Sequence, residues 1–392
     1  MLERVRNSLT DFFQEADLLL LGLCCSASLY GIILIYSATR YRGGNRSVII
    51  QAVALGLGIL AYVLMAQLDL EIVIKRWGWI AAFNVILILL LLTPLGIGGE
   101  EMGNTAWLRV PGIPISVGPA EIVKITFILL LAGQMAWLRE ERHDLRSFTS
   151  AIMVMGHTLF IMGLYVAISG DMGNGLVFFF VFLCMAFTAG FALRWFFLLF
   201  AGIGSLLVAA WRLDLIPLYQ KERFIVVFNH DYDPLGRGWQ QNRSMLALGS
   251  GGFFGQGYMQ GTQTQSLAQE SLPWRHTDFI FSSCGEELGL VGCAAIMLFL
   301  LFIILRILVV ARNAVTPFYC NVCVGVAAML MFQTIINIGM CLFVMPVIGI
   351  TLPFFSYGGS SLLTLFAAMG LVAGIKMRST TTIRRPPTNI LR

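Results

Sequence analysis

Long apolar segments alternate with short polar ones along almost the whole chain. Ten of the apolar segments have about the 20 residues that a helix needs to cross a hydrocarbon core roughly 30 Å thick. They predict membrane-spanning helices over 17–38, 48–67, 77–96, 119–138, 149–168, 174–192, 195–212, 285–311, 319–346 and 355–376. The apolar run that starts at Leu18 exceeds a signal-peptide core and is followed by further spans, so we interpret it as the first transmembrane helix. The pattern predicts an all-α polytopic membrane protein, with residues 1–392 forming a single integral membrane domain.

Composition supports this class of protein. Of the 392 residues, 58% are hydrophobic and 12% are charged, whereas a soluble domain carries about 25% charged residues. The eight cysteines lie in or beside apolar segments. Cys320 and Cys323 form a C-x-x-C pattern inside an apolar segment without companion ligands, so we interpret them as buried small side chains rather than a metal site.

The distribution of Lys and Arg predicts the orientation in the membrane. If the N-terminus is cytoplasmic, the inner segments, which include 68–76 and 139–148, hold fifteen of these residues and the short outer loops hold four. Both termini are then cytoplasmic, 377–392 is a basic cytoplasmic tail, and 213–284 is one large extracytoplasmic loop before the eighth helix. The net charge of +5 is explained by this bias and does not indicate a nucleic-acid partner.

Polar residues at the outer ends of two helices are candidate functional residues. Glu121 and Lys124 are three residues apart at the start of the fourth span, so they share a helix face and can pair. An acid in the first turn and a snorkelling lysine would be the structural explanation, but ionisable groups inside a membrane are usually functional. Asp171, in the turn "SGDMGNG", has the pattern of a helix N-cap, with a chemical role as the alternative.

The long outer loop holds the remaining candidates. "ALGSGGFFGQGYMQGTQTQ" is rich in Gly, Gln and Thr, so its backbone could approach a sugar or pyrophosphate, or it could be a solvated loop. The loop ends in "WRHTDFIF", with Asp278 followed by Glu286 and Glu287. Asp278 could cap the next helix or accept a proton, and we expect it to be ionised with an ordinary pKa near 3.9.

Several motifs carry a resemblance to a known family. "DPLGRGWQ", "ALGSGGFFGQG", "LPWRHTDFIF", "EELGLVG" and "PVIGITLPFFSYGGSS" occur in the order and at the approximate spacing of the SEDS family of cell-wall proteins, the FtsW/RodA family. The resemblance covers essentially the whole chain, and the "GTQ" segment is more similar to RodA than to FtsW. The chain departs from the family pattern at Gly118–Ala120, Ala106, Gly170–Gly173 and Arg243.

The resemblance implies a peptidoglycan glycosyltransferase that polymerises lipid II at the outer face of the bacterial cytoplasmic membrane, for cell elongation and shape. It implies a class B penicillin-binding protein as the partner and Asp278 as the catalytic residue. A divalent cation, Mg²⁺ or Mn²⁺, is the one cofactor that the leaving pyrophosphate could require. The expected substrate-binding residues are Trp107, Arg109, Glu121, Lys124, Asp171, Ser250, Arg275, His276 and Ser360.

Three alternatives stay open at this point. A lipid II flippase would need polar residues through the depth of the bilayer, whereas the charges cluster at the outer ends, which favours the enzyme. A division- or sporulation-specific FtsW-type paralogue would have the same fold and chemistry. A scaffold that only holds a penicillin-binding protein would not need Asp278 for polymerisation.

Overall fold

The structure, a computed structural model, describes residues 16–40, 45–98, 104–109, 116–141, 145–230, 232–233, 236, 238–267 and 271–384. Within these ranges nine helices are long and apolar enough to cross a membrane. They are α2 (Leu18–Thr39), α3 (Arg46–Gln67), α6 (Pro119–Glu141), α7 (Phe148–Ser169), α8 (Met172–Ala189), α9 (Leu193–Arg212), α12 (Ile280–Arg312), α13 (Pro317–Cys341) and α14 (Gly359–Arg384). A shorter apolar helix, α5 (Trp77–Leu89), continues as the 3-10 turn η2 (Leu90–Leu92) at the third expected span. The chain is a multi-pass membrane protein, as the sequence predicts.

The helices begin and end where polar residues and glycines interrupt the apolar segments. The side chains of Ser147, Asp171 and Thr316 accept hydrogen bonds from the first free backbone amides of α7, α8 and α13. Gly170 adopts the left-handed conformation (φ 73°) that ends α7 and lets α8 start two residues later.

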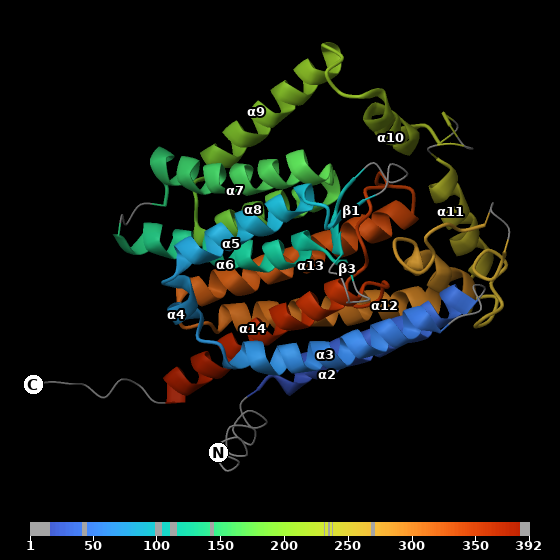
Figure 1. Ribbon diagram of the computed structural model, residues 1–392, viewed down its shortest axis with the longest axis horizontal. Coiled ribbons are helices and arrows are strands. Elements are labelled where there is room, and N and C mark those ends of the chain that lie inside the picture. Colours follow the sequence, from blue (N-terminus) through green and yellow to red (C-terminus); the bar gives the residue numbers. More distant parts are fainter. Residues whose placement is uncertain are drawn as a thin grey trace, which may run out of the picture.

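Close backbone packing holds the bundle together. A methyl group added at Gly370 or Gly374 of α14 would lie 2.5 Å from the carbonyl oxygen of Tyr62 or Ala66 of α3, respectively. Small residues at such contacts allow two membrane helices to pack through their backbones. In contrast, α9 has no buried residue and leans away from the bundle (Figure 1).

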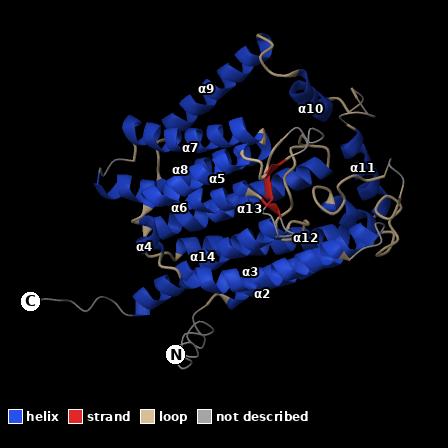
Figure 2. Cartoon of the chain, viewed as in Figure 1, coloured by secondary structure: helices blue, strands red, loops and turns tan. Residues whose placement is uncertain are grey.

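The two ends of the bundle differ in structure. The start of α2 and the end of α14 lie at one end, and α10 (Leu218–Phe228) and α11 (Trp239–Gly251) lie at the other (Figure 1). A short helix, α4 (Leu70–Ile74), lies in the connection between α3 and α5. The strands β1 (Gly96–Ile97), β2 (Trp107–Arg109) and β3 (Ser116–Val117) form a small antiparallel sheet in that order (Figure 2). We call the end with α10, α11 and the sheet the outer end.

The structure differs from the expected spans and loops after residue 212. Segment 213–284, which we expected to be one large loop, contains α10 and α11, and α12 begins inside it at Ile280. The ninth span ends at Cys341 and the tenth begins at Gly359, so residues 342–358 form an irregular segment between α13 and α14.

A break in α12 explains the glycines of the outer loop. Gly289 has non-helical backbone angles (φ 67°, ψ −161°), and the backbone groups that the break frees are bonded to segment 252–257. These bonds are Gln256 N to Glu286 O (2.8 Å), Gly257 N to Glu287 O (3.1 Å), Leu290 N to Gly252 O (3.0 Å) and Val291 N to Phe253 O (3.2 Å). A methyl group at Gly255 would lie 2.1 Å from Glu287 O. We expected the glycines to let the loop backbone approach a ligand. In the structure they let segment 252–257 approach the backbone of α12.

Candidate functional site

Asp278 lies in a turn directly before α12 at the outer end. The N-cap of α12 is Phe279 and receives no side-chain cap, so the capping role considered for Asp278 is wrong. Asp278 is half-buried as a residue, and its carboxyl group makes no hydrogen bond or ion pair with the described residues. Burial, with a smaller contribution from the negative charge of Asp171, raises its pKa from 3.8 to about 6. The expectation of an ordinary pKa is thus corrected.

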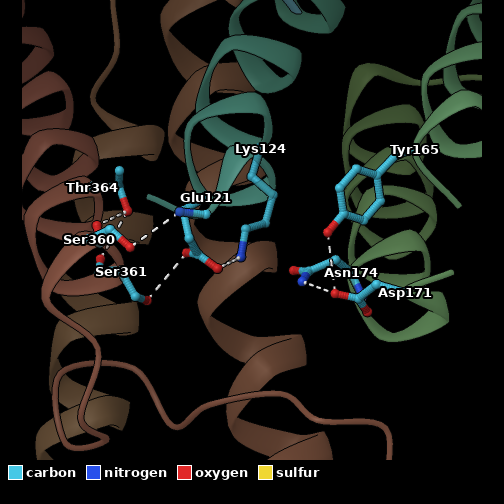
Figure 3. A network of polar contacts seen from close by, with 9 residues as sticks. Glu121, Lys124, Tyr165, Asp171, Asn174, Ser360, Ser361 and Thr364 are labelled. Carbon is cyan, nitrogen blue, oxygen red and sulfur yellow. Dashed lines mark hydrogen bonds and ion pairs between the residues drawn. The ribbon is translucent and has the colours of Figure 1, made fainter. Parts of the chain in front are cut away.

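Glu121 and Lys124 form the ion pair that their spacing predicts. The ammonium nitrogen of Lys124 lies 2.8 Å from Oε1 of Glu121, and the two side chains are 1% and 12% exposed. The hydroxyl of Ser361, on α14, donates to Oε2 of Glu121 (3.3 Å), and Figure 3 shows the glutamate between Ser361 and Lys124. Ser361 was not among the predicted residues, although it belongs to the same Gly-Gly-Ser-Ser run as Ser360. The pair therefore connects α6 to α14.

Asp171 caps α8 and is the centre of a second polar cluster. Its Oδ1 accepts from the backbone amide of Asn174 (3.1 Å), and its Oδ2 accepts from the Asn174 side chain (2.8 Å) and the Tyr165 hydroxyl (3.2 Å). The structural role that its pattern favoured is confirmed. Figure 3 shows this cluster on the side of Lys124 opposite Glu121, so the polar groups of α6, α7, α8 and α14 face one region.

Segment 348–350 connects this region to Asp278. A methyl group at Gly173, in the first turn of α8, would lie 2.5 Å from the carbonyl oxygen of Ile348. Asn337 of α13 donates from its side-chain nitrogen to the carbonyl oxygens of both Ile350 and Asp278, each at 2.8 Å. Asp278 and the start of α8, which carries Asp171, are therefore both connected to segment 348–350, consistent with the charge of Asp171 raising the pKa of Asp278.

Two further predicted residues lie next to the Glu121 pair, and a third lies on the same strand as one of them. Trp107, which is 37% exposed, packs on the start of α6, where a methyl group at Gly118 would lie 3.3 Å from its ring. Ser360 is buried and accepts from the amide of Gly118 (3.4 Å). Arg109, two residues after Trp107 on β2, is exposed. The structure thus brings Trp107 and Ser360 together with Glu121.

Arg275, one of the expected substrate-binding residues, is part of the structure of the loop. Its guanidinium is buried and donates to the carbonyl oxygens of Gln263, Thr264 and Ser266 and to the Ser271 hydroxyl. These bonds fold the loop over the arginine. We therefore leave Arg275 out of the proposed substrate contacts.

His276 and Ser250 also have defined positions. His276 is 7% exposed, and its ring lies 5.7 Å from that of Tyr357. Ser250 lies on α11, where its hydroxyl donates to the carbonyl oxygen of Ala247 (2.9 Å) and accepts from Gln256 (2.8 Å). Both of these bonds stay within α11 and the loop that follows it, and neither reaches the Glu121 and Asp171 clusters.

The two glutamates after Asp278 are anchors of the outer loop. The carboxylate of Glu286 accepts hydrogen bonds from the backbone or hydroxyl groups of Thr262, Gln263 and Thr264, at 2.6–3.0 Å. Glu287 accepts from Ser37 of α2 (2.5 Å) and from Gln265 (2.7 Å). Both are buried, so two buried carboxylates, each with donors on both oxygens, hold the loop to the bundle.

The described residues contain no group of three or more His, Cys, Asp or Glu side chains that could hold a metal ion. A Mg²⁺ or Mn²⁺ ion at this site would therefore need most of its ligands from substrate oxygens and water, as Mg²⁺ commonly has at phosphates.

The fold and the site together define a multi-pass membrane protein with a polar centre at the outer ends of its helices. Residues 13–381 match the family of cell cycle proteins that comprises FtsW, RodA and SpoVE. The chain belongs to this family.

The relatives and the solved structures agree with this assignment. The chain is 32% identical to the probable peptidoglycan glycosyltransferase FtsW of Trichlorobacter lovleyi, over 93% of this chain and 94% of the relative. It is 34% identical to the peptidoglycan glycosyltransferase MrdB of Escherichia coli K12, over 88% and 90%.

Two solved structures have the same fold. One is from work on the structural coordination of polymerization and crosslinking by a peptidoglycan synthase complex (TM-score 0.75, 29% identity, 93% of this chain and 98% of that chain). The other is the crystal structure of the rod shape determining protein RodA of Thermus thermophilus (TM-score 0.64, 27% identity, 92% and 96%).

Proposed function

We propose that the chain polymerises lipid II into glycan strands at the outer face of the bacterial cytoplasmic membrane and releases undecaprenyl diphosphate. As a member of a family whose curated relatives are named peptidoglycan glycosyltransferases, it is an enzyme of that class. The observation that carries the proposal is Asp278, a half-buried carboxyl group without a protein partner among the described residues, whose pKa is raised to about 6.

Asp278 acts as the general base. Glycan growth requires an acceptor hydroxyl to lose its proton while its oxygen attacks the anomeric carbon of the lipid-linked donor. A positioned carboxylate contributes roughly 10²–10⁴-fold to such a step, and it works best with a pKa near the operating pH. A pKa near 6 makes Asp278 a stronger base than an ordinary aspartate, while leaving most of it ionised at neutral pH.

The leaving group requires positive charge, because the bond to the pyrophosphate oxygen breaks with the electron pair on that oxygen. Arg109 is exposed beside Trp107 and is the candidate for a direct contact. Lys124 is buried against Glu121, so it contributes through the pair and the orientation of α6. A divalent cation, where one binds, would neutralise further charge on the pyrophosphate.

The proposed function also includes the orientation of the chain in the membrane, its protein partner and its role in the cell. Both termini lie in the cytoplasm and segment 213–284 lies outside, as the Lys and Arg distribution indicates. A class B penicillin-binding protein is the partner, supported by the similarity to a structure from a peptidoglycan synthase complex. The "GTQ" segment supports an elongation role, although the relatives include both FtsW and MrdB.

The substitution Asp278→Asn tests the function. Asparagine has nearly the same shape but cannot take the proton, and Asp278 does not cap α12, so the variant should fold and bind its partner as the wild type does. Purified with the penicillin-binding protein and incubated with lipid II, it should give no glycan polymer on a gel. Polymer at a rate near that of the wild type would refute the assignment of Asp278 as the base.

A further inference from the structure

We propose that Asn337 of α13 is a positioning residue for Asp278: its side-chain amide fixes the backbone of the turn that carries the carboxyl group. The inference rests on the proposed function, in which Asp278 takes the proton. Asn337 is fully buried, and its Nδ2 donates to the carbonyl oxygens of Asp278 and Ile350, at 2.8 Å each. One amide group therefore joins α13, the catalytic turn and segment 342–358.

The turn around Asp278 is held at every carbonyl. Each carbonyl oxygen from Trp274 to Asp278 accepts a hydrogen bond. The donors are Thr277 N and Phe279 N to Trp274 O (3.0 and 3.2 Å), Ser283 Oγ to Arg275 O (3.0 Å), Tyr357 N to His276 O (2.8 Å), Ser356 Oγ to Thr277 O (2.6 Å) and Asn337 Nδ2 to Asp278 O (2.8 Å). Donors from α12, α13 and segment 342–358 thus converge on five consecutive residues.

Backbone strain in the same region shows that these contacts determine its conformation. Trp274 (φ 45°) and Phe354 (φ 67°) both occupy the left-handed region, which bulky L residues rarely adopt. Such residues persist where the surrounding contacts over-determine the backbone. The surrounding contacts therefore hold the turn and the segment that supports it in a single backbone conformation, and Asn337 bonds to both.

The position of the Asp278 side chain depends on this backbone. Its carboxyl group has no hydrogen bond to the described residues that could orient it directly. The Asn337 amide bonds to the backbone carbonyl of Asp278 itself. It therefore fixes the backbone position from which the Asp278 side chain extends. A displacement of about 1 Å in a catalytic group can lower the rate by about 100-fold.

A second tether acts one step further away. Gln51 of α3 is buried, donates to the carbonyl oxygen of Ser356 (3.2 Å) and accepts from the amide of Gly358 (3.1 Å). It fixes Ser356, whose hydroxyl bonds to Thr277 O. Because Gln51 does not contact the turn itself in these bonds, we expect its loss to have a smaller effect than the loss of Asn337.

Three variants of α13 test the inference. Asn337→Leu removes both hydrogen bonds with little change in volume, and Asn337→Gln retains the amide on a longer side chain. Gln333→Leu is the matched control, because Gln333 is one turn away on the same helix, is 3% exposed and makes no hydrogen bond to the described residues of the turn. Each is purified with the partner, its thermal unfolding is measured, and the polymerisation rate is expressed per lipid II-binding enzyme.

We expect Asn337→Leu to lower the maximal rate by about 10–100-fold with a KM for lipid II within about two-fold of the wild type. Asn337→Gln should recover part of the rate, and Gln333→Leu should keep it. A purely structural role would instead lower the binding-competent fraction and leave the rate per binding enzyme unchanged. That result, or an equal loss in Gln333→Leu, would overturn the inference.

The failure of the inference can be told apart from the failure of the proposed function. If Asp278→Asn is inactive while Asn337→Leu keeps the wild-type rate per binding enzyme, the general base stands and the positioning role is refuted. If Asp278→Asn polymerises lipid II normally, both are refuted. If Asp278→Asn is inactive and Asn337→Leu lowers the rate per binding enzyme while Gln333→Leu keeps it, both the general base and the positioning role are supported.

Discussion

The pKa of Asp278 sets the acid side of the expected pH profile. Burial and the charge of Asp171 raise this pKa from 3.8 to about 6. A general base must be deprotonated, so activity should be present above the pKa and lost as the pH falls through about 6. An ordinary aspartate would lose activity about two pH units lower.

Removing the charge of Asp171 tests the cause of this shift. Burial is the larger of the two causes, so Asp171 supplies less than half of the rise, at most about one pH unit or about 1.4 kcal/mol. The substitution Asp171→Asn removes the charge, and asparagine is as good an N-cap for α8 as aspartate. The acid side of the profile should therefore move to lower pH, by less than about one unit.

The assay is lipid II polymerisation at saturating substrate over a pH series that brackets 6 by about two units on each side, with thermal unfolding measured at each pH. Asp69→Asn is the matched control, because Asp69 is also an aspartate N-cap, on α4 and at the other end of the bundle. It should leave the profile unchanged. A wild-type midpoint near 4, or a shift of the Asp171→Asn profile to higher pH, would refute the reasoning.

Two further predictions concern the Glu121 pair and the orientation. Glu121→Ala leaves the ammonium of Lys124, whose side chain is 1% exposed, without its partner. The substitution should therefore cost about 3–5 kcal/mol of stability and reduce polymerisation, and Lys124→Ala should do the same. Glu140→Ala, an exposed acid on the same helix, is the control, and wild-type polymerisation by both pair variants would remove the pair from the site. A cysteine at Leu267, which is 79% exposed, should react with a membrane-impermeant thiol reagent in intact cells, and one at Glu140 should not; the reverse labelling would overturn the orientation.

The helices could be predicted from the sequence because a membrane requires long apolar segments. Nine expected spans correspond to helices of spanning length among the described residues, and the third to a shorter one. The break at Gly289 could not be predicted, because a single glycine in an apolar run is compatible with a straight helix. Its cause is tertiary: the backbone of segment 252–257 bonds to the groups that the break frees. Helices α10 and α11 were missed because their sequences have a weak apolar pattern.

Individual roles in the polar outer segments were harder to predict than their locations. The spacing of Glu121 and Lys124 correctly predicts an ion pair, and the turn pattern of Asp171 correctly predicts a cap. Arg275 was expected to bind substrate because a guanidinium commonly binds phosphate. Its actual partners are three carbonyl oxygens 9–12 residues earlier in the chain and the hydroxyl of Ser271, and nothing in the local sequence distinguishes these two uses of the same group.

At the outer end, the buried charged groups that have a structural role differ from the proposed catalytic group in whether they have partners. Burying a charged group without partners is costly. Charged groups with a purely structural role should therefore have hydrogen-bond or ion-pair partners. This holds for the groups that fold the outer loop and the ends of α6 and α8: each has a hydrogen bond or an ion pair, namely Glu286, Glu287, Arg275, Asp171 and Glu121. Asp278 differs, because its backbone is bonded at every carbonyl of the turn while its carboxyl group has no hydrogen bond to the described residues and its pKa is raised to about 6. A carboxyl group on a fixed backbone and without a protein partner can still accept a hydrogen bond or a proton from a ligand. This is the physical reason for placing the reacting hydroxyl at Asp278.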